Sequence, residues 1–124
     1  MLTILRGLPG SGKTTLGEAL CARTGAVLVE ADQFFISPHG LYEFDRRRIR
    51  DAHAWCESRV RALLDEGRDV VVANTFSRLR EMKPYLEMGA PFLVVECKGR
   101  FESTHEVPAS VIENMRARWE SYPV

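Results

Sequence analysis

The sequence lacks the features that mark several large classes of protein. Its three cysteines, Cys21, Cys56 and Cys97, are odd in number and far apart, so we expect neither a disulfide framework nor a zinc site built on close cysteine pairs. No apolar run approaches the roughly 20 residues of a membrane-spanning helix, and the first residues hold no signal-peptide core. These absences predict a cytoplasmic protein with reduced thiols and no membrane partner.

An excess of charge of one sign is also missing. The 17 Lys and Arg residues equal the 17 Asp and Glu residues, so the formal net charge is zero at pH 7. This balance excludes a basic field over the whole protein, although a local arginine cluster can still attract nucleic acid. A hydrophobic content of 45% and a length of 124 residues are typical of one globular core. We therefore expect a single domain over residues 1–124.

Four short apolar runs alternate with segments of helical periodicity. The runs, each predicted to be a strand, are 2–6, 26–30, 70–73 and 92–96. The predicted helices are 13–23, 44–66, 78–88 and a last one from Pro108 through Trp119. This alternation predicts an α/β fold with about four parallel strands and helices on both faces of the sheet.

Several local features of these elements are also predicted. Run 26–30 is expected to be buried on both faces, and segment 33–42, which holds Pro38 and Gly40, is expected to be a structured loop. Pro84 is expected to interrupt the third helix. The predicted core face of the long helix carries Ile49, Ala52, Cys56, Val60 and Leu63.

A glycine-rich turn follows the first predicted strand. The string GLPGSGKT satisfies the pattern G-x-x-x-x-G-K-[ST] between a strand and a helix, where backbone N–H groups and the helix N-terminus can bind phosphate. Lys13 is expected to reach the β- and γ-phosphates of ATP, and the Thr14 hydroxyl to bind Mg²⁺. The predicted nucleotide-binding residues are Gly7, Leu8, Pro9, Gly10, Ser11, Gly12, Lys13, Thr14 and Thr15.

Asp32 follows the second predicted strand, at the edge of the sheet where the phosphate loop also lies. A carboxylate in this place can accept the proton of an attacking hydroxyl during phosphoryl transfer. Two other interpretations remain open: Asp32 can help to hold Mg²⁺ through water, or it can be a helix-capping or turn residue.

A basic cluster begins the long predicted helix, and aromatic residues precede it. The cluster contains Arg46, Arg47, Arg48 and Arg50, and the aromatic residues include Phe34, Phe35 and Tyr42. Arginines can contact the phosphates of a nucleic acid while aromatic rings stack on its bases. A solvated helix face beside core aromatics is an equally open interpretation.

Several strings, taken in order, resemble one known family. GLPGSGKTT, EADQFF, LYEFD with DAHAW, VVVANT, EMKPY and HEVPASVIENMRARWE are similar to the kinase domain of phage polynucleotide 5′-hydroxyl kinases and related small P-loop kinases. The resemblance covers nearly the whole chain. It implies a three-layer P-loop kinase fold and the ATP- and Mg²⁺-dependent transfer of a phosphoryl group to a hydroxyl of DNA or RNA.

The resemblance also implies roles for individual residues. Lys13, Asp32 and Arg100 would be catalytic, with Asp32 as general base and Arg100 in a basic lid before Val107. Thr14 and Asp32 would lie at the metal. Asn74 and Thr75 would meet the acceptor. Together with Phe35 and the residues singled out above, the predicted acceptor-binding set is Asp32, Phe35, Arg46, Arg47, Asn74 and Thr75.

The chain departs from the phage enzymes at two of these positions and in the lid. Phe35 stands where they have Arg, Asn74 stands where they have Asp, and the lid offers only Lys98, Arg100 and His105. These departures keep other acceptors open: a hydroxymethyl group on a modified DNA base, a small metabolite, or no acceptor in a nucleotide-binding module. The oligomeric state is not predicted.

Overall fold

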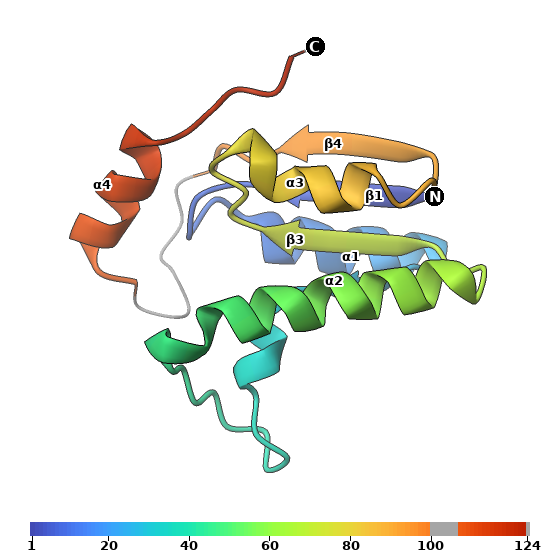
Figure 1. Cartoon of the computed structure of the whole chain (residues 1–124), viewed down its shortest axis with the longest axis horizontal. Coiled ribbons are helices and arrows are strands. Elements are labelled where there is room, and N and C mark those ends of the chain that lie inside the picture. The colour runs from blue at the N-terminus through green and yellow to red at the C-terminus, as the bar shows by residue number, and fades with distance from the viewer. Residues whose placement is uncertain (100–106, 124) are drawn as a thin grey trace.

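A four-stranded parallel sheet forms the centre of the molecule (Figure 1). The computed structural model describes residues 1–99 and 107–123. The strand order is β2-β3-β1-β4, and the strands are β1 (Leu2–Arg6), β2 (Val27–Val29), β3 (Val70–Asn74) and β4 (Phe92–Glu96). The helices are α1 (Lys13–Thr24), α2 (Ile49–Asp65), α3 (Leu79–Leu86) and α4 (Ala109–Ala117). The predicted α/β fold with four parallel strands is confirmed.

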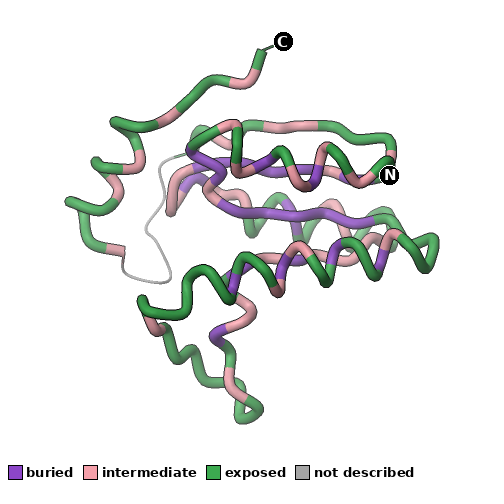
Figure 2. Tube along the Cα trace, viewed as in Figure 1, coloured by how far each residue is buried: buried purple, intermediate pink, exposed green. Residues whose placement is uncertain are grey.

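Alternation along the central strands divides the core into two layers. Leu2 and Ile4 of β1 belong to a cluster with Cys56 of α2 and Met82 of α3. Leu5 belongs instead to a second cluster, with Val71 and Ala73 of β3 and with Leu20 and Cys21 of α1. Successive side chains of a strand point to opposite faces, so α1 covers one face of the sheet while α2 and α3 cover the other. Figure 2 shows β3 buried throughout its length.

The edge strands correct the predicted burial. Run 26–30 was expected to be buried on both faces, but β2 is an edge strand in which only Val29 is buried. At the opposite edge, Phe92 and Leu93 of β4 are 42% and 52% exposed. An apolar run in the sequence indicates a strand that packs on apolar side chains. Whether that strand lies in the centre or at the edge of the sheet depends on its pairing with distant segments.

The predicted long helix begins later than expected. Residues Arg46–Arg48 form a separate 3-10 turn, η2, and α2 starts at Ile49, which is 39% exposed. The prediction that Ile49 lies in the core is wrong because this first residue of α2 lies beyond the edge of the packed layer. Ala52, Cys56, Val60 and Leu63 are buried as predicted.

Three other boundaries differ from expectation. The predicted loop 33–42 begins inside a 3-10 turn, η1 (Ala31–Phe35), and is closed by an antiparallel bridge between Ile36 and Tyr42. Helix α3 continues through Pro84, which loses a single backbone hydrogen bond while buried Met82 and Tyr85 hold the helix on the sheet. Helix α4 ends at Ala117, before Trp119. In the described ranges no helix has the length and apolarity needed to cross a membrane.

Candidate functional site

The carboxyl ends of three parallel strands bring together the segments that the sequence singled out. The phosphate loop follows β1, Asp32 follows β2, and Asn74 ends β3. Two hydrogen bonds tie these segments: the Gly7 N–H donates to the Thr75 carbonyl oxygen at 3.2 Å, and the Ala31 N–H donates to Asn74 Oδ1 at 2.8 Å. This edge is where ligands bind in open parallel sheets.

The backbone conformation of the phosphate loop favours glycine at several positions. Gly10 and Gly12 have φ angles of 82° and 88°, in the left-handed region that favours glycine. A Cβ on Gly7 would lie 2.2 Å from Ser11 Oγ and 2.9 Å from the Cys97 carbonyl oxygen. Helix α1 starts directly after Gly12, so its unpaired first amides face the loop and can bind an anion.

Lys13 lies partly buried at the start of α1. Its Nζ donates to the Leu8 carbonyl oxygen across the loop at 3.4 Å. Burial lowers the pKa of Lys13, whereas the negative charges of Glu30 and Asp32 act to raise this pKa. The ammonium group therefore lies at the loop, and its contact with a phosphate stays a prediction.

Glu30, which the sequence did not single out, contacts the first turn of α1 beside the phosphate loop. The Thr14 hydroxyl donates to Glu30 Oε2 at 2.7 Å, which joins the first turn of α1 to the end of β2. A signal was present: Glu30 directly follows β2, so the strand-end argument that singled out Asp32 applied equally to Glu30.

Asp32 lies in η1 with its side chain exposed. The Tyr42 hydroxyl donates to Asp32 Oδ1 at 3.4 Å. Burial raises the pKa of Tyr42 to about 12, and the charge and hydrogen bond of Asp32 contribute to this rise. Asp32 is thus exposed to solvent, with the hydroxyl of a tyrosine beside its carboxylate.

Asn74 and Thr75 are both engaged within the protein. Asn74 is 8% exposed, and besides its contact with Ala31 its Nδ2 donates to Cys56 Sγ at 3.5 Å. Thr75 holds Gly7 through its backbone carbonyl. The two residues therefore connect the segment that carries Asp32 to the phosphate loop, and their contact with an acceptor stays a prediction.

The aromatic residues that were predicted to contact an acceptor lie partly in the core and partly on the surface. Phe35 is 7% exposed and its ring packs against Phe34, Tyr42 and Phe44, so core packing alone accounts for this residue. Tyr42 and Phe44 are stacked on each other at 6.4 Å and are 38% and 53% exposed. These two rings, unlike Phe35, are accessible from solvent.

The arginine cluster is exposed but partly neutralised by neighbours. Arg47 forms a double hydrogen bond with the Asp45 carboxylate, and the charge of Arg48 is balanced by Asp51. The guanidinium of Arg48 also lies 4.7 Å from the centre of the Phe34 ring. Arg46 is exposed at the start of η2. Arg100 and His105, predicted for the lid, lie outside the described residues.

The described part of the chain has two notable pockets, one beside the phosphate loop and one between α2 and α3. A cleft of about 600 Å³ lies between the start of α1 and the end of β4, next to the phosphate loop, and its walls include Gly12, Leu16, Val95 and Gly99. Its volume is typical of a small-molecule site, and its largely apolar walls suit the nucleoside part of a nucleotide.

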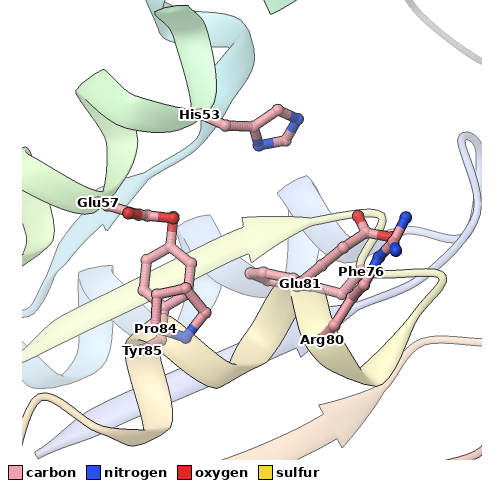
Figure 3. A pocket seen from close by; sticks show the side chains of 7 residues that line it. All are labelled: His53, Glu57, Phe76, Arg80, Glu81, Pro84 and Tyr85. Carbon is pink, nitrogen blue, oxygen red and sulfur yellow. The ribbon is translucent and has the colours of Figure 1, made fainter. Parts of the chain in front are cut away.

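The second pocket is smaller, about 180 Å³, and lies between α2 and α3 (Figure 3). His53 and Glu57 of α2 face Arg80, Glu81 and Tyr85 of α3 across it. None of the predicted catalytic or nucleotide-binding residues lines this pocket.

Comparison with known families and proteins agrees with this geometry. A family described as AAA domain matches residues 2–100. Human NEDD4-binding protein 2 is 35% identical over 91 residues, which are 71% of this chain but 5% of that protein. The chain therefore spans a small part of this relative.

Solved structures share the fold at low sequence identity. A chain of the Pnkp1/Rnl/Hen1 RNA repair complex is 24% identical with a TM-score of 0.71, and the match covers 94% of this chain and 43% of that one. A gluconokinase from Sinorhizobium meliloti is 19% identical with a TM-score of 0.64, over 96% of this chain and 74% of that one. At these identities the likeness shows the fold alone.

Proposed function

Because the chain belongs to the AAA domain family of P-loop kinases, we propose that it transfers the γ-phosphoryl group of ATP to a hydroxyl of a nucleic acid, with a polynucleotide 5′-hydroxyl as first candidate. Residues 1–124 would act as one kinase domain. The observation that carries the proposal is that the phosphate loop with Lys13 follows β1 and Asp32 follows β2, at the same edge of the parallel sheet. Phosphoryl transfer to an alcohol needs a cation at the phosphates and a base at the hydroxyl.

The residues divide into three roles under this proposal. The loop amides and Lys13 hold the phosphates and stabilise the charge that develops on them. Mg²⁺, when bound, neutralises phosphate charge, and Thr14 with a nearby carboxylate offers the oxygen ligands that this ion prefers. Asp32 orients the acceptor hydroxyl and accepts its proton at a carboxylate oxygen.

Two features support a nucleic-acid acceptor. Tyr42 contacts Asp32 and is stacked on the exposed Phe44, and Arg46 begins the turn that follows them. Rings and guanidinium groups in this arrangement suit bases and phosphates of a single strand. A component of an RNA repair complex has the same fold, which agrees with this acceptor. The gluconokinase has the same fold too, so a small alcohol must also be tested as acceptor.

Mapping the phosphorylated product tests the proposal. The chain would be incubated with Mg²⁺ and γ-labelled ATP together with 5′-hydroxyl DNA and RNA oligonucleotides, hydroxymethyl-base DNA, or gluconate, and each product examined by mass spectrometry. We expect phosphate at the 5′ end of an oligonucleotide and none with a Lys13→Ala chain. If only the modified base or only gluconate were labelled, that molecule would be the acceptor and the 5′-hydroxyl proposal would be wrong. If no molecule were labelled, the chain would be a nucleotide-binding module without transfer activity.

Replacing Asp32 by Asn separates a base from a metal-holding residue. If Asp32 accepts the acceptor's proton, the substitution lowers the transfer rate by about 10²-fold or more, the usual contribution of a positioned base. The affinity for ATP with Mg²⁺, measured by calorimetry, should change little. A large loss of this affinity would contradict the base role and favour metal binding through water.

A further inference from the structure

The threonine of the phosphate loop has a carboxylate partner from an unexpected strand. In P-loop nucleotide-hydrolysing enzymes the loop Ser or Thr shares Mg²⁺ with an acidic residue elsewhere in the sheet. Strand β3, which pairs with β1, ends here in Asn74, Thr75 follows it, and neither residue offers a carboxylate. The Thr14 hydroxyl instead contacts Glu30, at the end of the edge strand β2.

The two oxygens fit the requirements of a magnesium ion. Thr14 Oγ1 and Glu30 Oε2 are 2.7 Å apart, and neighbouring oxygen ligands in an octahedron with bonds of about 2.1 Å lie about 3 Å apart. In the described ranges 1–99 and 107–123, no group of three or more His, Cys, Asp and Glu residues is arranged to hold a metal by itself. Mg²⁺ ordinarily needs only one or two protein ligands, because phosphates and water supply the others.

We propose that Glu30, together with Thr14, holds the Mg²⁺ of a bound nucleotide, an inference that rests on the nucleotide-binding part of the function proposed above. Under this proposal Asp32 does not have to bind the metal, and its proposed role at the acceptor hydroxyl is unchanged. The two carboxylates that follow β2 would then have different roles. Glu30, which contacts Thr14 of α1, would bind the metal, and Asp32, which contacts Tyr42, would accept the proton of the acceptor hydroxyl.

A simpler role for Glu30 is to balance the charge of Lys13, since Glu30 is the carboxylate with the strongest effect on this ammonium group. The two roles differ in how they depend on the metal. Loss of a partner of Lys13 changes nucleotide affinity whether or not Mg²⁺ is present. Loss of a metal ligand changes only the part of the affinity that Mg²⁺ adds.

The experiment measures the affinity for ADP by calorimetry, once in EDTA and once in Mg²⁺, for the unchanged chain and for Glu30→Gln. Glutamine keeps an oxygen that can accept from Thr14 but removes the negative charge. We expect the affinity in EDTA to be nearly unchanged and the gain from Mg²⁺ to fall by about 10- to 100-fold. Glu18→Gln, an exposed substitution on α1 with the same change in charge, is the control and should behave as the unchanged chain.

Binding of Mn²⁺ to the ADP complex, followed by electron paramagnetic resonance, gives a second readout that needs no catalysis. Weaker Mn²⁺ binding in Glu30→Gln but not in Glu18→Gln would support the proposal. An equal effect of Glu30→Gln on ADP affinity with and without Mg²⁺, or no effect in either, would overturn it. Failure to phosphorylate any nucleic acid would leave these results valid, whereas absence of ADP binding to the unchanged chain would overturn both proposals.

Discussion

At the scale of single residues, the Asn74 side chain holds the backbone of the segment that carries Asp32. It is buried at the end of β3, and its Oδ1 accepts the backbone N–H of Ala31, the residue before Asp32. The phosphate loop is held separately, by the backbone of Thr75. The position of the candidate base and that of the loop thus depend on different atoms of neighbouring residues.

This separation leads to a prediction for Asn74→Ala. The substitution leaves the Ala31 N–H without its acceptor and releases the segment that carries Asp32, so we expect kcat for phosphoryl transfer to fall by about 10- to 100-fold. KM for ATP should stay nearly constant because the Thr75 carbonyl still holds Gly7. Steady-state kinetics with ATP and an oligonucleotide would measure both constants.

Asn74→Asp is the matched variant, because a carboxylate oxygen can also accept from Ala31. We expect it to recover most of kcat while the buried charge lowers stability. If Asn74→Ala lowered only the melting temperature and left kcat unchanged, the side chain would have a structural role and no positioning role.

At the scale of elements, the phosphate loop is the part that the sequence predicted best, because its function depends on neighbouring positions. Pattern, strand and helix stand side by side in the sequence, and the structure has them in the same order. What the sequence could not predict depends on distant contacts. The contact of Thr14 with Glu30 joins α1 to β2, and the edge positions of β2 and β4 follow from pairing with β3 and β1.

The tight packing of the loop predicts the effect of Gly7→Ala. The added Cβ would lie 2.2 Å from Ser11 Oγ and 2.9 Å from the Cys97 carbonyl oxygen, so the loop must shift. Overpacking of this kind costs about 1–3 kcal/mol, and we expect ADP affinity measured by calorimetry to fall by about tenfold or more. The double variant Gly7→Ala/Ser11→Gly removes the closer contact and should recover part of the affinity. Unchanged affinity in Gly7→Ala would show that the loop accommodates the methyl group.

At the scale of the whole molecule, the C-terminal segment is attached to the sheet mainly through a few contacts that follow α4. No residue of α4 is buried. Beyond the helix, Trp119 Nε1 donates to Glu96 Oε1 at 3.2 Å, and the Glu120 N–H donates to the Ser77 carbonyl oxygen at 2.7 Å. The Trp119 ring also lies 4.1 Å from the guanidinium of Arg6. The segment thus meets the same edge of the sheet as the phosphate loop.

Arg6 explains why this attachment matters for stability. It is fully buried at the end of β1, and its Nε and Nη2 both donate to the Phe76 carbonyl oxygen. Burial lowers the pKa of Arg6, and the charges of Glu96, Glu81 and Glu120 act against this change. An arginine stays charged in proteins, so the guanidinium needs partners on every side, and the Trp119 ring covers one of them.

Trp119→Ala should therefore destabilise the whole fold. It removes the ring over Arg6 and the hydrogen bond to Glu96 together, and we expect the free energy of unfolding to fall by about 1–3 kcal/mol. Urea denaturation followed by far-ultraviolet circular dichroism measures this change without relying on tryptophan fluorescence. Trp119→Phe keeps a ring over Arg6 but loses the donor to Glu96, so its loss should be smaller. Equal stability of Trp119→Ala and the unchanged chain would mean that the Trp119 ring does not dock on Arg6 in solution. The guanidinium would then depend on the Phe76 and Ser77 carbonyl oxygens and on the charge of nearby glutamates such as Glu96.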